Sequence, residues 1–321
     1  MSQPPTSQLH EVARLAARII EEMSLVIEGK PQQLRTAVTV LLAEGHLLIE
    51  DVPGVGKTVL ARSLGRAIDG DFRRIQFTPD LLPSDVTGVS VFNQSTREFE
   101  FKRGGVFAHI VLGDEINRAS PKTQSALLEA MAESQVSVDG HSYQLARPFM
   151  VIATQNPIEM EGTYPLPEAQ RDRFMARITM GYPARASEVA MLTHNAAGDR
   201  ITEVRPVASA GQVSAAATVI RQVYVAPAIN DYIVSIVEGT RNHPDLRLGA
   251  SPRASLHLMR VARVVATLAG RDYVIPEDVQ ELAREVLAHR LLPTVEAQVA
   301  RRDPGDIVSE VISATRLPER G

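Results

Sequence analysis

The stretch EDVPGVGKT, residues 50–58, most constrains what this chain can fold into. Gly54 and Gly56 leave the backbone free to curl its N–H groups around phosphate oxygens. Lys57 can reach the β- and γ-phosphates of a nucleotide, and the Thr58 hydroxyl can bind Mg²⁺. Such a loop works between a strand and a helix, so the flanking sequence has to provide both.

The strict form of this pattern, G-x-x-x-x-G-K-[ST], has glycine at the position that Asp51 occupies here. The mechanism depends on the later glycines, the lysine and the hydroxyl, so this first glycine is the dispensable one. A surface turn that contains Gly-Lys-Thr by chance is the alternative. The apolar run HLLIED (46–51) before the loop predicts a buried strand, and KTVLARSLGRAI (57–68) after it predicts a helix.

Short apolar strands alternate with helices as far as about residue 182, which predicts an α/β fold. The further predicted strands are FRRIQF (72–77), HIVLGD (109–114), FMVIATQ (149–155) and ARITMGY (176–182). Helices such as PKTQSALLEAMAE (121–133) separate them, so we expect a parallel sheet covered by helices on both faces. Two helices precede the loop: one has apolar residues at helical spacing from Leu9 to Met23, and the other runs from Pro31 to Gly45.

The second part of the chain predicts helices alone, in a separate domain. Pro252 and Pro276 mark helix starts and Gly270 follows a helix end. Residues 301–321 indicate one more short helix with a polar, loose end.

Polar side chains follow two of the predicted strands. Asp114 and Glu115 end one strand, where an aspartate can hold the Mg²⁺ shell and a glutamate can deprotonate an attacking water. Asn156 follows the next strand, where its amide could bond the water or the γ-phosphate. A strand that simply ends in two solvated acids is the alternative, and the phosphate loop upstream argues against it.

The composition excludes several classes of protein. With 34 Lys+Arg against 38 Asp+Glu the formal net charge is −4, so the chain has no bulk basic footprint for nucleic acid or anionic membrane. Zero cysteines exclude disulfides and thiolate metal sites. The N-terminus has no signal-peptide pattern, and no apolar run approaches a membrane span, so we expect a cytoplasmic protein.

Four stretches, taken together and in order, resemble the MoxR family of AAA+ ATPases. They are EDVPGVGKT, GDEINRASPKTQSALLEAMAE, ATQNPIEMEGTYPLPEAQRDRF and GASPRAS, and the resemblance runs from about residue 25 to about residue 293. It implies a three-layer αβα nucleotide-binding core over residues 1–184, followed by an all-α lid over residues 185–321. MoxR-like loops commonly carry an acidic or another non-glycine residue at the position of Asp51, so the resemblance favours a true site for ATP or ADP.

The resemblance also assigns roles to individual residues. It implies that the nucleotide contacts are Pro53, Gly54, Val55, Gly56, Lys57, Thr58, Val59 and Asp114, with Thr58 and Asp114 also serving Mg²⁺. Glu115 would be the catalytic base and Asn156 the sensor 1 residue. Arg173 would be an arginine finger for the neighbouring subunit, with Arg171 the weaker candidate. Arg253 would be sensor 2, reaching from a mobile lid into the pocket of its own chain.

Two inserted segments match a helix-2 insert at about 86–104, expected as a hairpin inside a helix, and a pre-sensor-1 hairpin at about 135–147. Asp139-Gly140 between alternating apolar residues predicts the second hairpin. Its acidic tip disfavours a nucleic-acid motor, which would need lysine or arginine there.

The resemblance therefore implies an Mg²⁺-dependent ATPase that remodels or matures a protein client. The resemblance implies a hexameric ring and a partner with a von Willebrand factor A domain. A chelatase-like motor subunit for metal insertion and a nucleotide-controlled assembly switch remain alternatives. Intact Glu115 and Asn156 argue against the switch, because a pure switch could lose its base.

Overall fold

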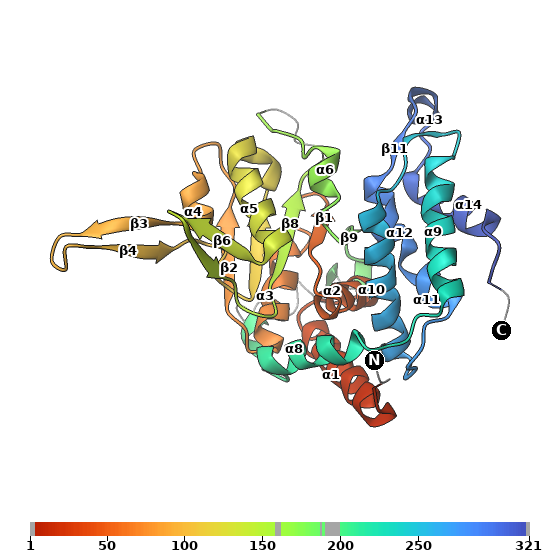
Figure 1. Ribbon diagram of the computed structural model, residues 1–321, viewed down its shortest axis with the longest axis horizontal. Coiled ribbons are helices and arrows are strands. Elements are labelled where there is room, and N and C mark those ends of the chain that lie inside the picture. The colour runs from red at the N-terminus through yellow and green to blue at the C-terminus, as the bar shows by residue number, and fades with distance from the viewer. Residues whose placement is uncertain (1–3, 158–161, 187, 190–199, 319–321) are drawn as a thin grey trace.

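The protein forms an α/β core with a helical lid beside it (Figure 1). The computed structural model describes residues 4–157, 162–186, 188–189 and 200–318. Residues 158–161, within the third motif of the MoxR resemblance, lie outside this description.

The core is built on a five-stranded sheet in the order β2-β5-β8-β1-β9. Its strands are β1 (Leu47–Glu50), β2 (Phe72–Gln76), β5 (Ile110–Asp114), β8 (Met150–Gln155) and β9 (Ala176–Ile178). All the neighbouring pairs run parallel, which confirms the predicted parallel sheet. The carboxyl ends of β1, β5 and β8 therefore meet at one edge.

Both faces of the sheet are buried, as the continuous apolar runs require. Leu47 and Ile49 of β1 pack into one apolar cluster, and Leu48 between them packs into the other. The first face is covered by α1 (Thr6–Ser24), α2 (Pro31–Leu42) and α3 (Lys57–Ala67), and the second by α4 (Pro83–Thr87) and α5 (Pro121–Glu133). The predicted αβα layering is confirmed.

The end of α2 differs from the prediction. The helix stops at Leu42, and Glu44, with a φ of 54°, makes the turn. Gly45 is needed for close packing instead, since a Cβ there would lie 2.5 Å from the sulfur of Met175.

Both predicted hairpins are present. The first consists of β3 (Gly88–Asn93) and β4 (Glu98–Arg103) and extends away from the side that carries the lid (Figure 1). It follows α4, but the chain then runs through a glycine turn to β5, so the expectation of a hairpin inside a helix is wrong. The second consists of β6 (Gln135–Val138) and β7 (His141–Gln144), joined by a two-residue turn in which Asp139 and Gly140 both have positive φ.

The lid is mainly helical. Its elements are α9 (Pro227–Arg241), α10 (Pro252–Leu268), α11 (Pro276–Glu281), α12 (Ala283–Leu287), the 3₁₀ turn η4 (Ala288–Arg290), α13 (Val295–Val299) and α14 (Pro304–Ala314). The predicted helical lid is confirmed, with one addition: β10 (Leu246–Leu248) and β11 (Leu292–Pro293) pair as a small antiparallel sheet. Pro252 and Pro276 begin helices as predicted.

The lid is not separated from the core. Apolar residues of α10, such as Leu258 and Val261, belong to the same continuous cluster as the inner faces of α1 and α2. Two further elements precede the lid helices, the 3₁₀ turn η3 (Arg200–Glu203) and α8 (Ala210–Ile220), and α8 packs against α1 and α2. Within the described part of the chain, no helix is both long and apolar enough to cross a membrane.

Candidate nucleotide site

A cavity of about 390 Å³ opens where β1, β5 and β8 end. Its lining residues are Pro53, Gly54, Gly56, Lys57, Thr58, Val59, Arg74, Asp114, Glu115 and Asn156. The sequence predicted all of these except Arg74. Val55, the remaining predicted loop residue, packs instead against the apolar core beneath the loop.

The backbone of the phosphate loop adopts left-handed conformations at its two glycines. Gly54 and Gly56 have φ values of 83° and 91°, in the region that strains other residues. Gly56 caps α3, so the first N–H groups of this helix and the positive end of its dipole face the cavity. Lys57 begins the helix, and its Nζ donates to the carbonyl oxygens of Asp51 at 2.6 Å and Val52 at 3.1 Å. The loop is suited to bind an anion such as a phosphate.

Asp51 has a structural task that explains the departure from the strict loop pattern. Its Oδ2 accepts a hydrogen bond of 2.6 Å from the N–H of Gly181, and its Oδ1 accepts one of 2.8 Å from the N–H of Val52. The buried carboxylate therefore ties the start of the loop to the segment that follows β9. This position requires an acceptor, and its backbone does not need the freedom of glycine.

We expect Asp51→Gly to destabilise the protein although it restores the strict loop pattern. The N–H of Gly181 would lose its acceptor, at a cost of about 1–3 kcal/mol in the free energy of unfolding. Asp51→Asn, which keeps one acceptor oxygen, should lose less, and Asp80→Gly at an exposed turn is the control. Urea unfolding measures all three, and equal stability of Asp51→Gly and the wild type would contradict this role.

The two predicted acids lie side by side at the end of β5, and each has defined partners. The Oδ1 of Asp114 accepts from the Thr154 hydroxyl at 2.6 Å, and its Oδ2 accepts from Arg74 Nη2 at 2.6 Å. The Oε2 of Glu115 accepts from Gln76 Nε2 and from Arg118 Nη1, both at 2.9 Å. Glu115 has a φ of 56°, an uncommon value for a residue other than glycine and one found at functional sites.

Arg74 and Gln76 are functional candidates that the sequence reading missed. They alternate on β2, which lies beside β5, so both reach the acids on the neighbouring strand. Their period-2 spacing places both side chains on one face of β2. It indicates a contact with the two acids only once β2 is known to lie beside β5.

The cavity has the oxygen donors that suit Mg²⁺. Thr58 and Asp114 both line it, and hard oxygen ligands with a few protein contacts are typical of Mg²⁺ bound together with a nucleotide phosphate. The Asp114 carboxylate, which already accepts from Arg74, would be one ligand of the metal. When bound, Mg²⁺ would neutralise phosphate charge.

The two predicted arginines do not line this cavity. Arg173 and Arg253 instead line a second cleft of about 190 Å³, together with Arg260, His257 and Glu44. Arg253 Nη1 lies 3.6 Å from the Oδ2 of Asp172, the residue before Arg173. The expected reach of Arg253 into the pocket of its own chain is therefore not seen, because α10 is packed against α1 and α2.

Comparisons with known proteins agree with this geometry. A family model of ATPases associated with various cellular activities (AAA) matches residues 46–176, and an AAA lid domain model matches residues 238–311. Chaperone MoxR1 of Mycobacterium tuberculosis is 42% identical over 94% of this chain and 82% of its own length. The chain belongs to the MoxR family of AAA+ ATPases.

Two further relatives match most of the MoxR-family chain. Bacillus subtilis YeaC, a protein named as uncharacterised, is 50% identical over 95% of both chains. A crystal structure of a Cytophaga hutchinsonii protein, named provisionally as an ATPase, has a TM-score of 0.90 and 37% identity over 98% of both chains. The AAA match runs from β1 into β9 and so brackets the nucleotide cavity, whereas the lid match leaves out α8.

Proposed function

We propose that this MoxR-family protein hydrolyses ATP with Mg²⁺ at sites completed between neighbouring subunits. Lys57 and the N-terminus of α3 bind the phosphates, and Thr58 and Asp114 hold the metal. Glu115 deprotonates the attacking water, and Asn156 orients the water or the γ-phosphate. Arg74 and Gln76 hold the two acids in place until nucleotide and metal enter.

One observation carries this proposal: the phosphate loop, both acids and Asn156 share one cavity, whereas Arg173 and Arg253 share another. Phosphoryl transfer is catalysed mainly by positioning and by charge stabilisation, so a site with Lys57 and Mg²⁺ alone stays slow. Cations held elsewhere on the subunit can complete the site of a neighbour. We therefore assign both arginines to the neighbouring subunit's nucleotide.

We further propose that the subunits form a hexameric ring whose nucleotide-driven motion remodels a protein client, with a von Willebrand factor A domain protein as partner. The word chaperone in the name of a relative supports a protein client. The hairpin of β3 and β4 adds support, because Phe92 and Phe99 are exposed on it and exposed apolar side chains suit protein contacts.

ATP with Mg²⁺ should increase the population of rings, because the γ-phosphate links Arg173 of one subunit to the pocket of the next. Sedimentation velocity at micromolar protein measures this, with ADP and the Arg173→Ala variant as controls. Both controls should assemble less, since each lacks one side of the link. An unchanged monomer at saturating ATP would count against the shared site.

Release of phosphate from ATP tests the proposed activity directly, with and without chelation of Mg²⁺. Turnover that stops on chelation and returns with added Mg²⁺ is expected. To find the client, Glu115→Gln protein loaded with ATP can be compared with Lys57→Ala protein as bait. The first should retain bound proteins that the second does not.

A further inference from the structure

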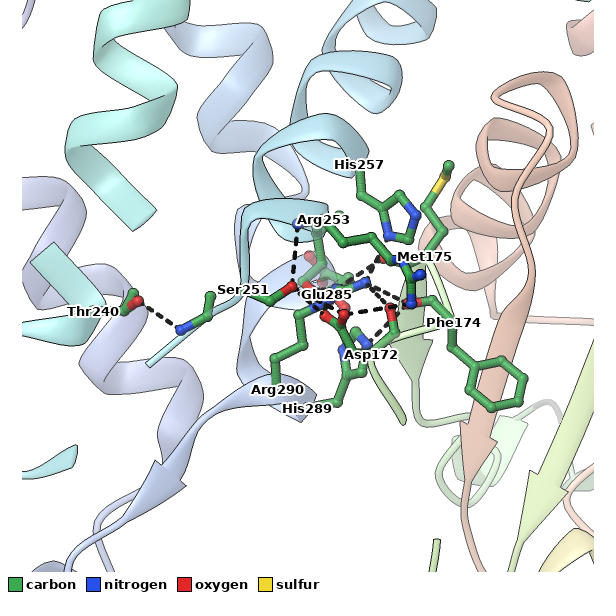
Figure 2. Close-up of polar contacts among 12 residues, drawn as sticks. Asp172, Phe174, Met175, Thr240, Ser251, Arg253, His257, Glu285, His289 and Arg290 are labelled. Atoms are coloured by element: carbon green, nitrogen blue, oxygen red, sulfur yellow. Dashed lines mark hydrogen bonds and ion pairs between the residues drawn. The ribbon is translucent and has the colours of Figure 1, made fainter. Parts of the chain in front are cut away.

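Asp172, the residue before the proposed finger, is held by the lid (Figure 2). Its carboxylate accepts from the Ser251 hydroxyl at 2.8 Å and from Arg290 Nε at 2.9 Å, and it faces Arg253 at 3.6 Å. Ser251 and Arg253 lie at the start of α10, and Arg290 ends η4. Two separate lid elements, α10 and η4, therefore both contact the side chain of Asp172.

Arg290 makes more contacts than this ion pair. Its side chain is 2% exposed, and its Nη2 donates to the carbonyl oxygens of Asp172 at 3.1 Å and Phe174 at 2.6 Å. Its Nη1 donates to the carbonyl oxygens of Met175 and Val286. Figure 2 shows Arg290 among Asp172, Phe174 and Met175. Asp172 and Phe174 flank Arg173, so the backbone on both sides of the proposed finger is bonded to one buried lid arginine.

Two buried histidines complete the cluster in neutral form. Burial, together with the charge of Arg290, lowers the pKa of His257 to about 2, so its Nδ1 accepts from Arg290 Nη2 at 2.6 Å. Burial also lowers the pKa of His289, whose ring lies 3.2 Å from the Phe174 carbonyl oxygen. Burial, opposed by Asp172, lowers the pKa of Arg290 to about 10, which leaves it charged at neutral pH.

Arg290 makes more hydrogen bonds than are needed to attach the lid to the core. Apolar packing of α10 on α1 and α2 already joins the lid to the core, and a buried ion pair is weak evidence for stability. The planar guanidinium instead fixes the orientation of the backbone around Arg173, because its N–H donors point in fixed directions toward the carbonyl oxygens there.

We propose that Arg290 is a positioning residue that sets the geometry of Arg173 through Asp172 and the Phe174 and Met175 carbonyls. A shift of the lid then moves the finger and Arg253 as one unit. This inference rests on the proposed function, in which Arg173 serves the neighbouring subunit. The lid would then affect hydrolysis of the nucleotide bound by the next subunit, in addition to any effect on the nucleotide of its own chain.

The substitution Arg290→Lys tests this proposal, because lysine keeps the charge and loses the fork of donors. We expect kcat to fall on the order of 10²-fold, as for a catalytic group displaced by about 1 Å, with nucleotide affinity unchanged. Hydrogen exchange should rise at residues 172–176 and stay unchanged at residues 53–58. Arg284→Lys, at an exposed arginine of the same lid that pairs with Asp303 and Asp306, is the matched control.

Mixing with Lys57→Ala separates positioning from general damage. Arg290→Lys subunits keep their own pocket, so intact fingers from Lys57→Ala subunits should restore part of the activity. Arg173→Ala mixed with Lys57→Ala is the positive control, and its failure would refute the shared site itself. Rescue of Arg173→Ala without rescue of Arg290→Lys would overturn the positioning role.

A milder variant covers the case in which Arg290→Lys does not fold. Ser251→Ala removes the hydroxyl that donates to Asp172 and that also caps α10 by accepting from the Arg253 N–H. Ser251→Ala should have the same effects as Arg290→Lys but to a smaller extent. We expect kcat to be several-fold lower, nucleotide affinity to be unchanged, and activity to be partly restored by mixing with Lys57→Ala subunits. Loss of nucleotide affinity in step with kcat would refute the proposal.

Discussion

Lys57→Ala should abolish nucleotide binding, whereas Glu115→Gln should keep binding and lose about 10³-fold in hydrolysis. In the proposed mechanism the lysine charge acts on the phosphates of the bound ground state, beside a loop whose glycines have the positive φ values that suit an anion. The glutamate would act only as the water attacks the γ-phosphate, so its loss should affect the transition state.

Titration with a fluorescent ATP analogue and phosphate release together distinguish the two roles. Lys122→Ala and Glu129→Gln, at exposed positions of α5, make the same chemical changes away from the cavity. Both controls should bind and hydrolyse like the wild type. Equal loss of binding in Lys57→Ala and Glu115→Gln would contradict the assigned roles.

Local chemistry made much of this site predictable from the sequence. Gly54 and Gly56 indicate backbone positions with positive φ. Asp114 ends an apolar run that indicates a buried strand. Parallel strands expose their carboxyl ends at one edge, so the loop, the acids and Asn156 had to meet there. The turn at Asp139-Gly140 was equally local.

What the sequence could not provide depends on contacts between distant segments. Arg74 matters because β2 lies beside β5, a strand order that no single strand encodes. Asp51 pairs with a backbone N–H 130 residues away. Arg290 lies 118 residues from Asp172 and reads as an ordinary helix-end cation. The placement of Arg253 beside the finger likewise follows from how α10 packs.

Arg173→Ala should cost on the order of 10³-fold or more in ATP turnover while leaving nucleotide affinity unchanged. The removed guanidinium belongs to a cleft separate from the pocket of its own chain, so ground-state binding there does not depend on it. Arg253→Ala should resemble it, because Arg253 lines the same cleft. Arg302→Ala, at a lid arginine that pairs with Asp245 and Glu310, is the control and should keep full activity.

The most direct test of sites shared between subunits is to mix inactive subunits. A ring that contains Arg173→Ala and Lys57→Ala subunits has some interfaces where an intact pocket meets an intact finger. Phosphate release from such mixtures should rise well above that of either variant alone, and Arg253→Ala should be rescued in the same way. Absence of rescue in rings shown to contain both variants would contradict the shared site, whereas rescue of Arg173→Ala alone would return Arg253 to the pocket of its own chain.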